Sequence, residues 1–136
     1  MIFSDTGAWI ALSDKSDQYH HNAVRIYSEL KNRKERFVTS DYVLDETLTR
    51  LRYDAGYRIA VKFLDAIAAS QESGILSVVR IDDMLFAKAV SVFRKYDSAV
   101  LSFTDCTSFA LCREYGIHQA FAFDSHFSMM GISLVS

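Results

Sequence analysis

The chain contains no proline, and only five of its 136 residues are glycine. Without proline, no helical pattern contains a residue that lacks an amide donor, so glycine alone marks the breaks between elements. The sequence also has no repeat, no low-complexity stretch and no linker-like segment. Half of the residues are apolar, enough for a continuous core, and we expect residues 1–136 to form a single domain.

Cysteine is scarce, and no apolar run is long. Cys106 and Cys112 are six residues apart, which on a helix points them about 240° away from each other and disfavours a disulfide between them. No apolar run reaches the ~20 residues of a membrane span, and Asp5 interrupts the apolar N-terminus. The sequence therefore predicts a soluble, cytoplasmic protein whose thiols are reduced and buried, with no membrane contact.

The chain has no excess of positive charge, because its formal net charge is −2 and its pI is near 6.0. Bulk attraction to nucleic acid is thereby excluded, and a polyanion would need a local basic patch or bound metal ions. Two groups of basic residues offer a patch: Arg50, Arg52, Arg58 and Lys62, and also Lys31, Arg33, Lys34 and Arg36. For the second group, an ordinary solvated charged surface is the better interpretation.

Apolar periodicity predicts strands that alternate with helices. Short strands are expected at residues 1–4, 37–39, 75–81, 118–123 and 132–135. A turn at residues 5–7 precedes a helical pattern that continues to Leu30, and further helices are expected at residues 41–53, 58–70, 83–93 and 104–115. This alternation indicates an α/β fold with a mostly parallel central sheet flanked by helices.

Four acidic residues occupy positions that suit a metal-dependent nuclease: Asp5, Glu46, Asp105 and Asp124. Three of them end an apolar run or begin a helical pattern, and the carboxyl ends of parallel strands border the ligand crevice of an open α/β sheet. Clustered carboxylates repel one another unless a cation neutralises them, and Mg²⁺ and Mn²⁺ prefer oxygen ligands. The set therefore predicts a metal site at which a water can be activated to attack a phosphodiester.

Two of these acids also have ordinary structural explanations near strand ends. Asp5 precedes Thr6 and Gly7, so it fits a turn or a helix N-cap. Asp124 fits a turn residue that caps the short segment 125–130. Taken alone, the structural explanation is the stronger one for Asp5, whereas position at a strand end favours function for Asp124.

The two helical acids are equally ambiguous. Asp105 stands at capping-box spacing from Ser102, so a structural and a catalytic role are about equally supported. Glu46 lies roughly opposite the apolar stripe of Leu44, Leu48 and Leu51 on the predicted helix. A residue on the polar face is solvated unless that face lines a cleft. Asp45 adjoins Glu46, so the acid that this helix contributes to the set could be either of the two residues.

Four segments of the chain resemble the PIN-domain nucleases, and most of all the VapC-type toxins: DTGAW at Asp5, DET at Glu46, SFTDCTSFA at Asp105 and AFDSHF at Asp124. The resemblance covers essentially the whole chain. It implies an endoribonuclease dependent on Mg²⁺ or Mn²⁺ that leaves 5′-phosphate and 3′-hydroxyl ends. It also implies a homodimer, and an RNA substrate together with a small antitoxin protein that covers the acidic pocket. Catalytic and metal-binding roles fall by this resemblance on Asp5, Glu46, Asp105 and Asp124.

Several neighbours of the acids are weaker candidates. Thr6 and Thr104 flank acids, and their hydroxyls suit the orientation of ligands or water. His126 suits a phosphate contact or a proton donor, although its place two residues after Asp124 is more typical of a turn. Trp9 and the phenylalanines fit the core or a dimer contact better than base stacking.

Other classes of function remain open beside the toxin. One is a housekeeping PIN-domain nuclease that processes RNA. Another is a catalytically silent interaction domain, which the repulsion within an idle acidic cluster disfavours. A third is a phosphoacceptor module. A phosphatase of the haloacid-dehalogenase type needs an aspartate where this chain has Gly7, and no late strand ends in the lysine that a receiver needs.

Overall fold

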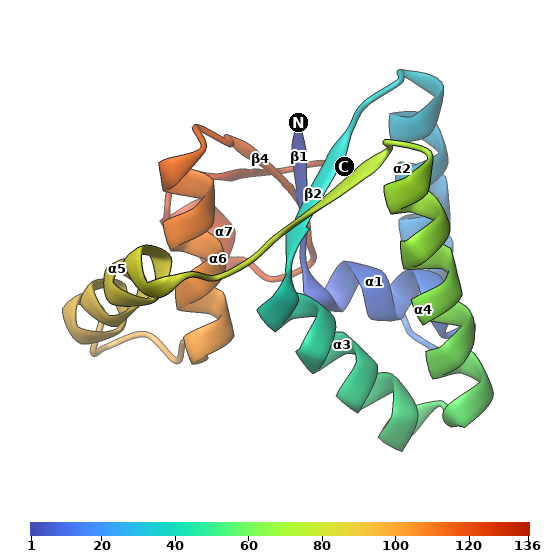
Figure 1. The fold of residues 1–136 in the computed structure, drawn as a ribbon, viewed down its shortest axis with the longest axis horizontal. Coiled ribbons are helices and arrows are strands. Elements are labelled where there is room, and N and C mark those ends of the chain that lie inside the picture. The colour runs from blue at the N-terminus through green and yellow to red at the C-terminus, as the bar shows by residue number, and fades with distance from the viewer.

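The computed structural model describes all 136 residues and places a five-stranded sheet at the centre of the molecule (Figure 1). The strands are β1 (Ile2–Ser4), β2 (Phe37–Ser40), β3 (Leu76–Val79), β4 (Gln119–Phe121) and β5 (Ser133–Leu134). They lie in the order β3-β2-β1-β4-β5, and every neighbouring pair is parallel. The predicted α/β fold with a mostly parallel sheet is confirmed.

Seven helices flank this sheet: α1 (Thr6–Ser13), α2 (His20–Asn32), α3 (Asp41–Asp54), α4 (Tyr57–Glu72), α5 (Asp83–Lys95), α6 (Phe103–Glu114) and α7 (His126–Met129). In Figure 1, α1, α2 and α4 lie on one side of the sheet, and α5, α6 and α7 lie on the other. Helix α3 continues from the carboxyl end of β2 and packs against α1, α4 and α6. None of the seven helices combines the length and the apolar composition needed to cross a bilayer.

The N-terminal helical region differs from the prediction in two ways. The expected turn at residues 5–7 is the start of α1, and the expected single helix to Leu30 is two helices separated by residues 14–19. The break has a local cause. The carboxylate of Asp14 accepts hydrogen bonds from the amide and hydroxyl of Ser16 at 3.0 and 2.7 Å, and Asp17 accepts one from the amide of Tyr19 at 2.9 Å. Such side-chain bonds compete with the helical ladder.

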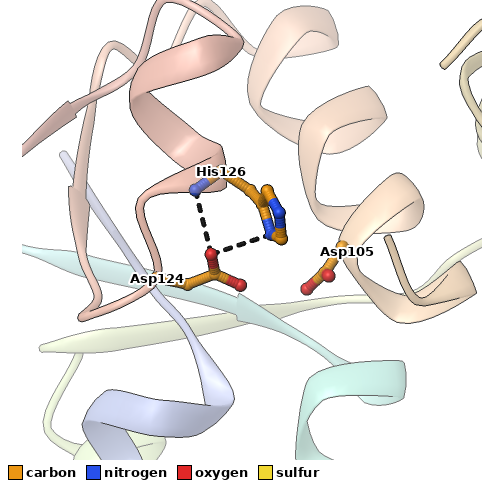
Figure 2. A group of neighbouring side chains, drawn as sticks. All are labelled: Asp105, Asp124 and His126. Carbon is orange, nitrogen blue, oxygen red and sulfur yellow. Dashed lines mark hydrogen bonds and ion pairs between the residues drawn. The ribbon is translucent and has the colours of Figure 1, made fainter. Parts of the chain in front are cut away.

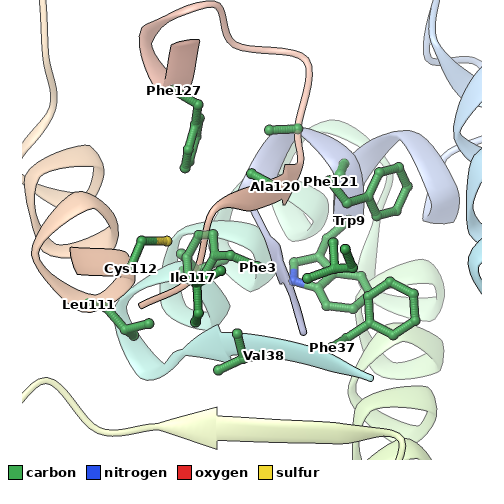
Figure 3. Close-up of a cluster of buried hydrophobic side chains, with 14 of the residues drawn as sticks. Phe3, Trp9, Phe37, Val38, Leu111, Cys112, Ile117, Ala120, Phe121 and Phe127 are labelled. Carbon is green, nitrogen blue, oxygen red and sulfur yellow. The ribbon is translucent and has the colours of Figure 1, made fainter. Parts of the chain in front are cut away.

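The core lies on both faces of the sheet (Figure 3). All three residues of β1 and all four of β2 are buried, as expected for parallel strands that helices cover on both sides. On one face Trp9 packs edge-on against Phe63, with ring centroids 5.8 Å apart. On the other face Phe127 contacts both Phe3 and Phe109, at 6.0 and 5.1 Å. Both cysteines are buried and free, as predicted.

A buried chain of hydrogen bonds fixes the carboxyl end of β1. Trp9 Nε1 donates to Thr39 Oγ1 at 3.3 Å, and that hydroxyl donates to the carbonyl of Ser4 at 2.9 Å. Buried polar groups that are paired in this way hold one geometry, because breaking the chain would leave a desolvated group unpaired. Helix α1 and strand β2 are therefore tied to the residue that precedes Asp5.

Candidate active site

The sheet order creates a switch point between β1 and β4. The chain extends the sheet from β1 to β2 and β3 on one side, and later from β4 to β5 on the other. Ligands of open α/β sheets bind at the carboxyl ends of the strands beside such a point. Asp5 follows β1 directly, Asp124 follows β4 after two residues, and the amide of Asp5 donates to the carbonyl of Phe121 at 3.1 Å. Two of the four predicted acids thus stand at this edge.

Asp5 is a buried carboxylic acid, with 6% of the residue exposed. It occupies the N-cap position of α1, but its side chain makes no capping hydrogen bond. Burial raises its pKa to about 7, the Thr6 amide opposes that rise, and the charges of Asp105, Glu46 and Asp124 add to it. The four predicted acids are therefore close enough to act on one another. A buried carboxylate in such surroundings calls for a cation.

Asp105 is the capping residue that its spacing from Ser102 predicted, and its carboxylate also lies beside the other acids. It is the third residue of α6, where Ser102 Oγ accepts from its amide at 3.0 Å and its Oδ2 accepts from the Ser102 amide at 3.1 Å. Burial raises the pKa of Asp105 against these hydrogen bonds, and the charges of Asp124 and Glu46 raise it further. The capping box holds the carboxylate in place beside the other acids, so its structural role is compatible with a role as a metal ligand.

Asp124 and His126 form the tightest polar contact of the site (Figure 2). Asp124 Oδ1 accepts from the backbone amide of His126 at 2.9 Å and lies 2.9 Å from His126 Nδ1. Together with Asp105, these residues offer three ligand atoms that all lie within 4.8 Å of one another. The sequence favoured a turn for His126. The structure instead makes it the first residue of α7, with its ring beside the acids. The spacing Asp-x-His could have indicated this contact, because the hydrogen bond from the His126 amide to Asp124 turns the imidazole ring towards the carboxylate.

Glu46 lies close enough for its charge to raise the pKa of Asp5 and Asp105, because the buried stripe of α3 differs from the predicted one. The buried residues of this helix are Val43, Thr47 and Leu51, so Glu46 lies beside the stripe and is half-buried. Thr47 is polar, but its hydroxyl donates to the Val43 carbonyl at 2.7 Å and can therefore be buried. Asp45 is exposed, whereas Glu46 is half-buried and its charge helps to raise the pKa of Asp5 and Asp105, so the geometry favours Glu46.

Two hydroxyl groups flank Asp5 without a protein partner. Ser4 and Thr6 are 0% and 2% exposed, and neither Oγ atom makes a hydrogen bond. An unpaired buried hydroxyl costs free energy unless a ligand or water satisfies it. The residues at this edge thus fit a hard divalent cation and its waters: carboxylate oxygens to bind it, and hydroxyls to orient the waters. Thr6 was a sequence candidate, whereas Ser4 was missed because it reads as an ordinary strand residue.

The two basic groups lie in different places. Arg50 and Arg52 are exposed on α3, and Arg58 and Lys62 are exposed on α4. The other group ends at Arg36, directly before β2, and three of its members line a hollow that also includes Gly74. This hollow lies at the amino ends of β2 and β3, the edge of the sheet opposite to the acids. A solvated surface therefore remains the better interpretation of that group.

Comparison with known proteins agrees with this geometry. The PIN domain family model matches residues 2–132, and the chain belongs to that family. Among its relatives is a Mycobacterium tuberculosis protein named 23S rRNA-specific endonuclease VapC20, 37% identical over 131 residues, which are 96% of this chain and 95% of that protein. A VapC ribonuclease of Archaeoglobus fulgidus is 32% identical over 128 residues, 92% of this chain and 78% of that protein. The resemblance drawn from the four motifs is confirmed.

Solved structures give the same result. The crystal structure of M. tuberculosis VapC20, described as a toxin that cleaves the sarcin-ricin loop, superimposes with a TM-score of 0.86 at 36% identity, covering 97% of this chain and 96% of that one. VapBC2 of Rickettsia felis, solved with a DNA fragment from its promoter, gives a TM-score of 0.66 at 12% identity, covering 98% and 97%. The second similarity concerns the fold alone.

Proposed function

We propose that this protein is a metal-dependent endoribonuclease in which Asp5, Glu46, Asp105 and Asp124 bind Mg²⁺ or Mn²⁺. The observation that carries the proposal is the buried Asp5 carboxylate, whose pKa the three other acids help to raise. A cluster of this kind is unfavourable by itself and becomes favourable around a divalent cation. Relatives that span nearly the whole chain are named as an endonuclease and a ribonuclease, which supports the same activity.

The residues of the chain divide the work of phosphodiester hydrolysis. A divalent cation held by these acids would supply Lewis acidity, which would lower the pKa of a water and stabilise the leaving oxygen. Asp5 and Asp105 hold fixed positions, set by burial and by the capping box, and are the main ligands. Glu46 and Asp124 complete the negative cluster, and the hydroxyl groups of Ser4 and Thr6 orient water. The products are a 5′-phosphate and a 3′-hydroxyl, as expected for the family.

We infer that the cellular role is that of a toxin acting on RNA in the cytoplasm. A relative that is 37% identical over 96% of the chain is named for 23S rRNA, and its structure is described as cleaving the sarcin-ricin loop. A structured loop of ribosomal RNA is therefore the substrate we propose. The net charge of −2 disfavours indiscriminate binding to RNA, which agrees with a narrow target.

Cleavage of a labelled sarcin-ricin hairpin tests this proposal. We expect cleavage with Mg²⁺ or Mn²⁺, none with chelator, and little on an unstructured RNA of the same composition. Asp5→Asn and Glu46→Gln should each lower the rate at least about 100-fold, because each removes a negative ligand. Asp45→Asn is the matched control and should retain the wild-type rate. Metal-dependent cutting of many RNAs but not the hairpin would favour the housekeeping nuclease. Full activity of Glu46→Gln would contradict the assignment.

We propose that the protein is a homodimer that associates through an aromatic surface beside the site, formed by Phe86, Phe93 and Phe103. The first two residues are 43% and 53% exposed. Phe103 lies between the other two rings, at centroid distances of 5.0 and 6.1 Å, and precedes Asp105 by two residues. Contiguous apolar surface of this kind marks an interaction site, and a second copy presents the same surface in return.

Sedimentation equilibrium tests the dimer. Phe93→Asp should raise the dimer dissociation constant at least about tenfold, because a charge would be buried in the contact. Leu64→Asp is the matched control, since Leu64 is a 50% exposed apolar residue on α4, away from the aromatic surface, and should leave association unchanged. A wild-type protein that stays monomeric at tens of micromolar would rule out this surface as a dimer contact.

We propose that a small antitoxin protein binds this chain, and the apolar groove between α1, α2 and α4 supports the proposal. The groove has a volume of about 280 Å³. Its lining includes the apolar side chains of Trp9, Phe63 and Ile67 and the basic side chains of Lys15 and Lys62. An amphipathic partner segment with acidic flanks would match it. In a binding assay without RNA, Lys62→Glu should weaken the antitoxin at least about tenfold relative to Lys31→Glu. Equal affinities of the two variants would contradict this site.

A further inference from the structure

His126 presents a nitrogen atom that the protein leaves unsatisfied. Nδ1 is buried and has no hydrogen-bond partner, although it lies only 2.9 Å from Asp124 Oδ1. The two atoms are close, but the ring is not aligned for a hydrogen bond between them. Resting on the proposed metal-dependent function, we propose that His126 supplies a nitrogen ligand to the ion held by Asp105 and Asp124, and that this ligand makes the site prefer Mn²⁺ to Mg²⁺.

The distances fit shared coordination. Neighbouring ligands of an octahedral ion, each about 2.1 Å from the metal, are about 3 Å apart, and opposite ligands are about 4.2 Å apart. The 2.9 Å between Nδ1 and Oδ1 matches neighbouring ligands. The ligand atoms of Asp105, Asp124 and His126 all lie within 4.8 Å of one another, so they need to move only a little to surround one ion. Figure 2 shows the imidazole and both carboxylates facing the same space.

The ring is held there by residues outside the site. The next residue, Phe127, is fully buried and packs between Phe3 and Phe109, which anchors α7 against the sheet. The backbone amide of His126 is itself bonded to Asp124. Both constraints fix the backbone at this position. The imidazole therefore lies near the carboxylates although its Nδ1 makes no hydrogen bond. This preorganisation lowers the entropy that metal binding would otherwise cost.

An ion pair between Asp124 and His126 is the alternative explanation, and it leaves Nδ1 unexplained. An ion pair with good geometry would align the ring N–H with Oδ1, because charge-assisted hydrogen bonds are short and directional. A metal ion satisfies the nitrogen and the oxygen together. Imidazole nitrogen binds divalent first-row transition metals, with Mn²⁺ the weakest of them, whereas Mg²⁺ takes oxygen ligands almost exclusively. The nitrogen ligand therefore favours Mn²⁺ over Mg²⁺ at a site whose other donors are oxygens.

Pulsed electron paramagnetic resonance of the full chain with Mn²⁺ alone, without RNA, tests the inference directly. We expect ¹⁴N modulation from a bound imidazole in the wild-type protein and its loss in His126→Ala. His118→Ala is the matched control, because His118 is exposed before β4 at the opposite edge of the sheet, and the modulation should persist there. By calorimetry, His126→Ala should raise the Mn²⁺ dissociation constant about tenfold and that for Mg²⁺ less than about threefold.

The outcomes separate this inference from the proposed function. Mn²⁺ bound without ¹⁴N modulation in the wild-type protein would overturn the role of His126 and leave the acidic site intact. Modulation that survives in His126→Ala would do the same. Equal loss of both metals in that variant would overturn the selectivity. Failure of Mn²⁺ to bind the wild-type protein, or wild-type affinity in Asp105→Asn, would instead refute the metal site itself. The wild-type spectrum decides the first question without any substitution.

Discussion

Asp5 shows at the scale of a single residue how a site can oppose the stability of its own fold. Its carboxylate is buried next to three other acids, and its pKa is raised from 3.8 to about 7. The folded chain therefore binds a proton that the unfolded chain has already released between these two values. Since stability falls with pH wherever the folded state holds more protons, the metal-free protein loses stability as pH rises from about 4 to about 7.

Unfolding by urea in the presence of chelator measures this loss. Between pH 5 and pH 7 we expect the Asp5 carboxyl to lower the free energy of unfolding by up to about 3 kcal/mol, at 1.36 kcal/mol for each pKa unit. Asp105 acts in the same direction, because its pKa is also raised. Asp5→Asn should flatten the pH dependence and make the metal-free protein more stable at pH 7.

The control for this prediction is Asp65→Asn, which changes the same charge at an exposed position of α4. Its pH profile should follow that of the wild-type protein. An Asp5→Asn variant that is less stable than wild type at pH 7 would show that Asp5 supports the fold, as a turn or cap residue would, and that its burial in the charged form is not costly.

At the scale of elements, the capping box of α6 connects local stability with the site. Ser102→Ala removes the hydroxyl that accepts from the Asp105 amide and should cost about 1 kcal/mol of stability. It also frees the Asp105 carboxylate from one of its constraints, so the cleavage rate should fall by about tenfold. Stability from urea unfolding and the cleavage rate are measured on the same preparation.

Ser125→Ala provides the comparison, because Ser125 occupies the N-cap position of α7 but makes no side-chain capping bond. Neither its stability nor its activity should change by more than the error of measurement. If Ser102→Ala lost stability but kept full activity, the capping box would be only a structural feature, and Asp105 would hold its position through other contacts.

Elements with a strong local signal could be predicted from the sequence. The capping box of α6 was visible in the spacing of Ser102 and Asp105. Helix α5 was expected from residue 83, directly after Asp82, whose side chain accepts from the Leu85 amide at 2.9 Å. Strand positions were also predictable, because covered parallel strands form continuous apolar runs. In these cases the residues that determine the element lie within a few positions of one another.

Features that depend on distant or unusual contacts could not be predicted. The buried stripe of α3 contains Thr47, whose burial depends on a hydroxyl bond within the helix that composition does not reveal. Helix α7 has only four residues, too few for a periodic pattern, so His126 read as a turn residue. The family resemblance and the strand positions predicted that the four acids would meet. The order of the strands in the sheet, in contrast, could not be predicted and is known only from the fold.

At the scale of the whole molecule, strand order brings residues that lie far apart in sequence to one edge. Asp5 and Asp124 are separated by nearly the whole chain, yet they follow the neighbouring strands β1 and β4. Helices α3 and α6 contribute Glu46 and Asp105 from either side. Since β1 contacts both β2 and β4, unfolding of the sheet separates all four acids at once. A ligand bound to the acids should therefore stabilise the entire fold.

Thermal unfolding with metal tests that coupling. An ion held by the four acids would bind the folded chain, in which the acids are gathered, and not the unfolded one. At ten times its dissociation constant it should add about 1.4 kcal/mol. For a chain of this length that corresponds to a rise of about 5 °C in Tm.

The rise should be larger at pH 8 than at pH 5, because protons compete for Asp5 and Asp105 at low pH. Asp105→Asn should abolish the response, whereas Asp45→Asn should keep it. A metal-induced rise that is equal in both variants would mean that the ion binds elsewhere on the surface, and the acids at the switch point would then need another explanation.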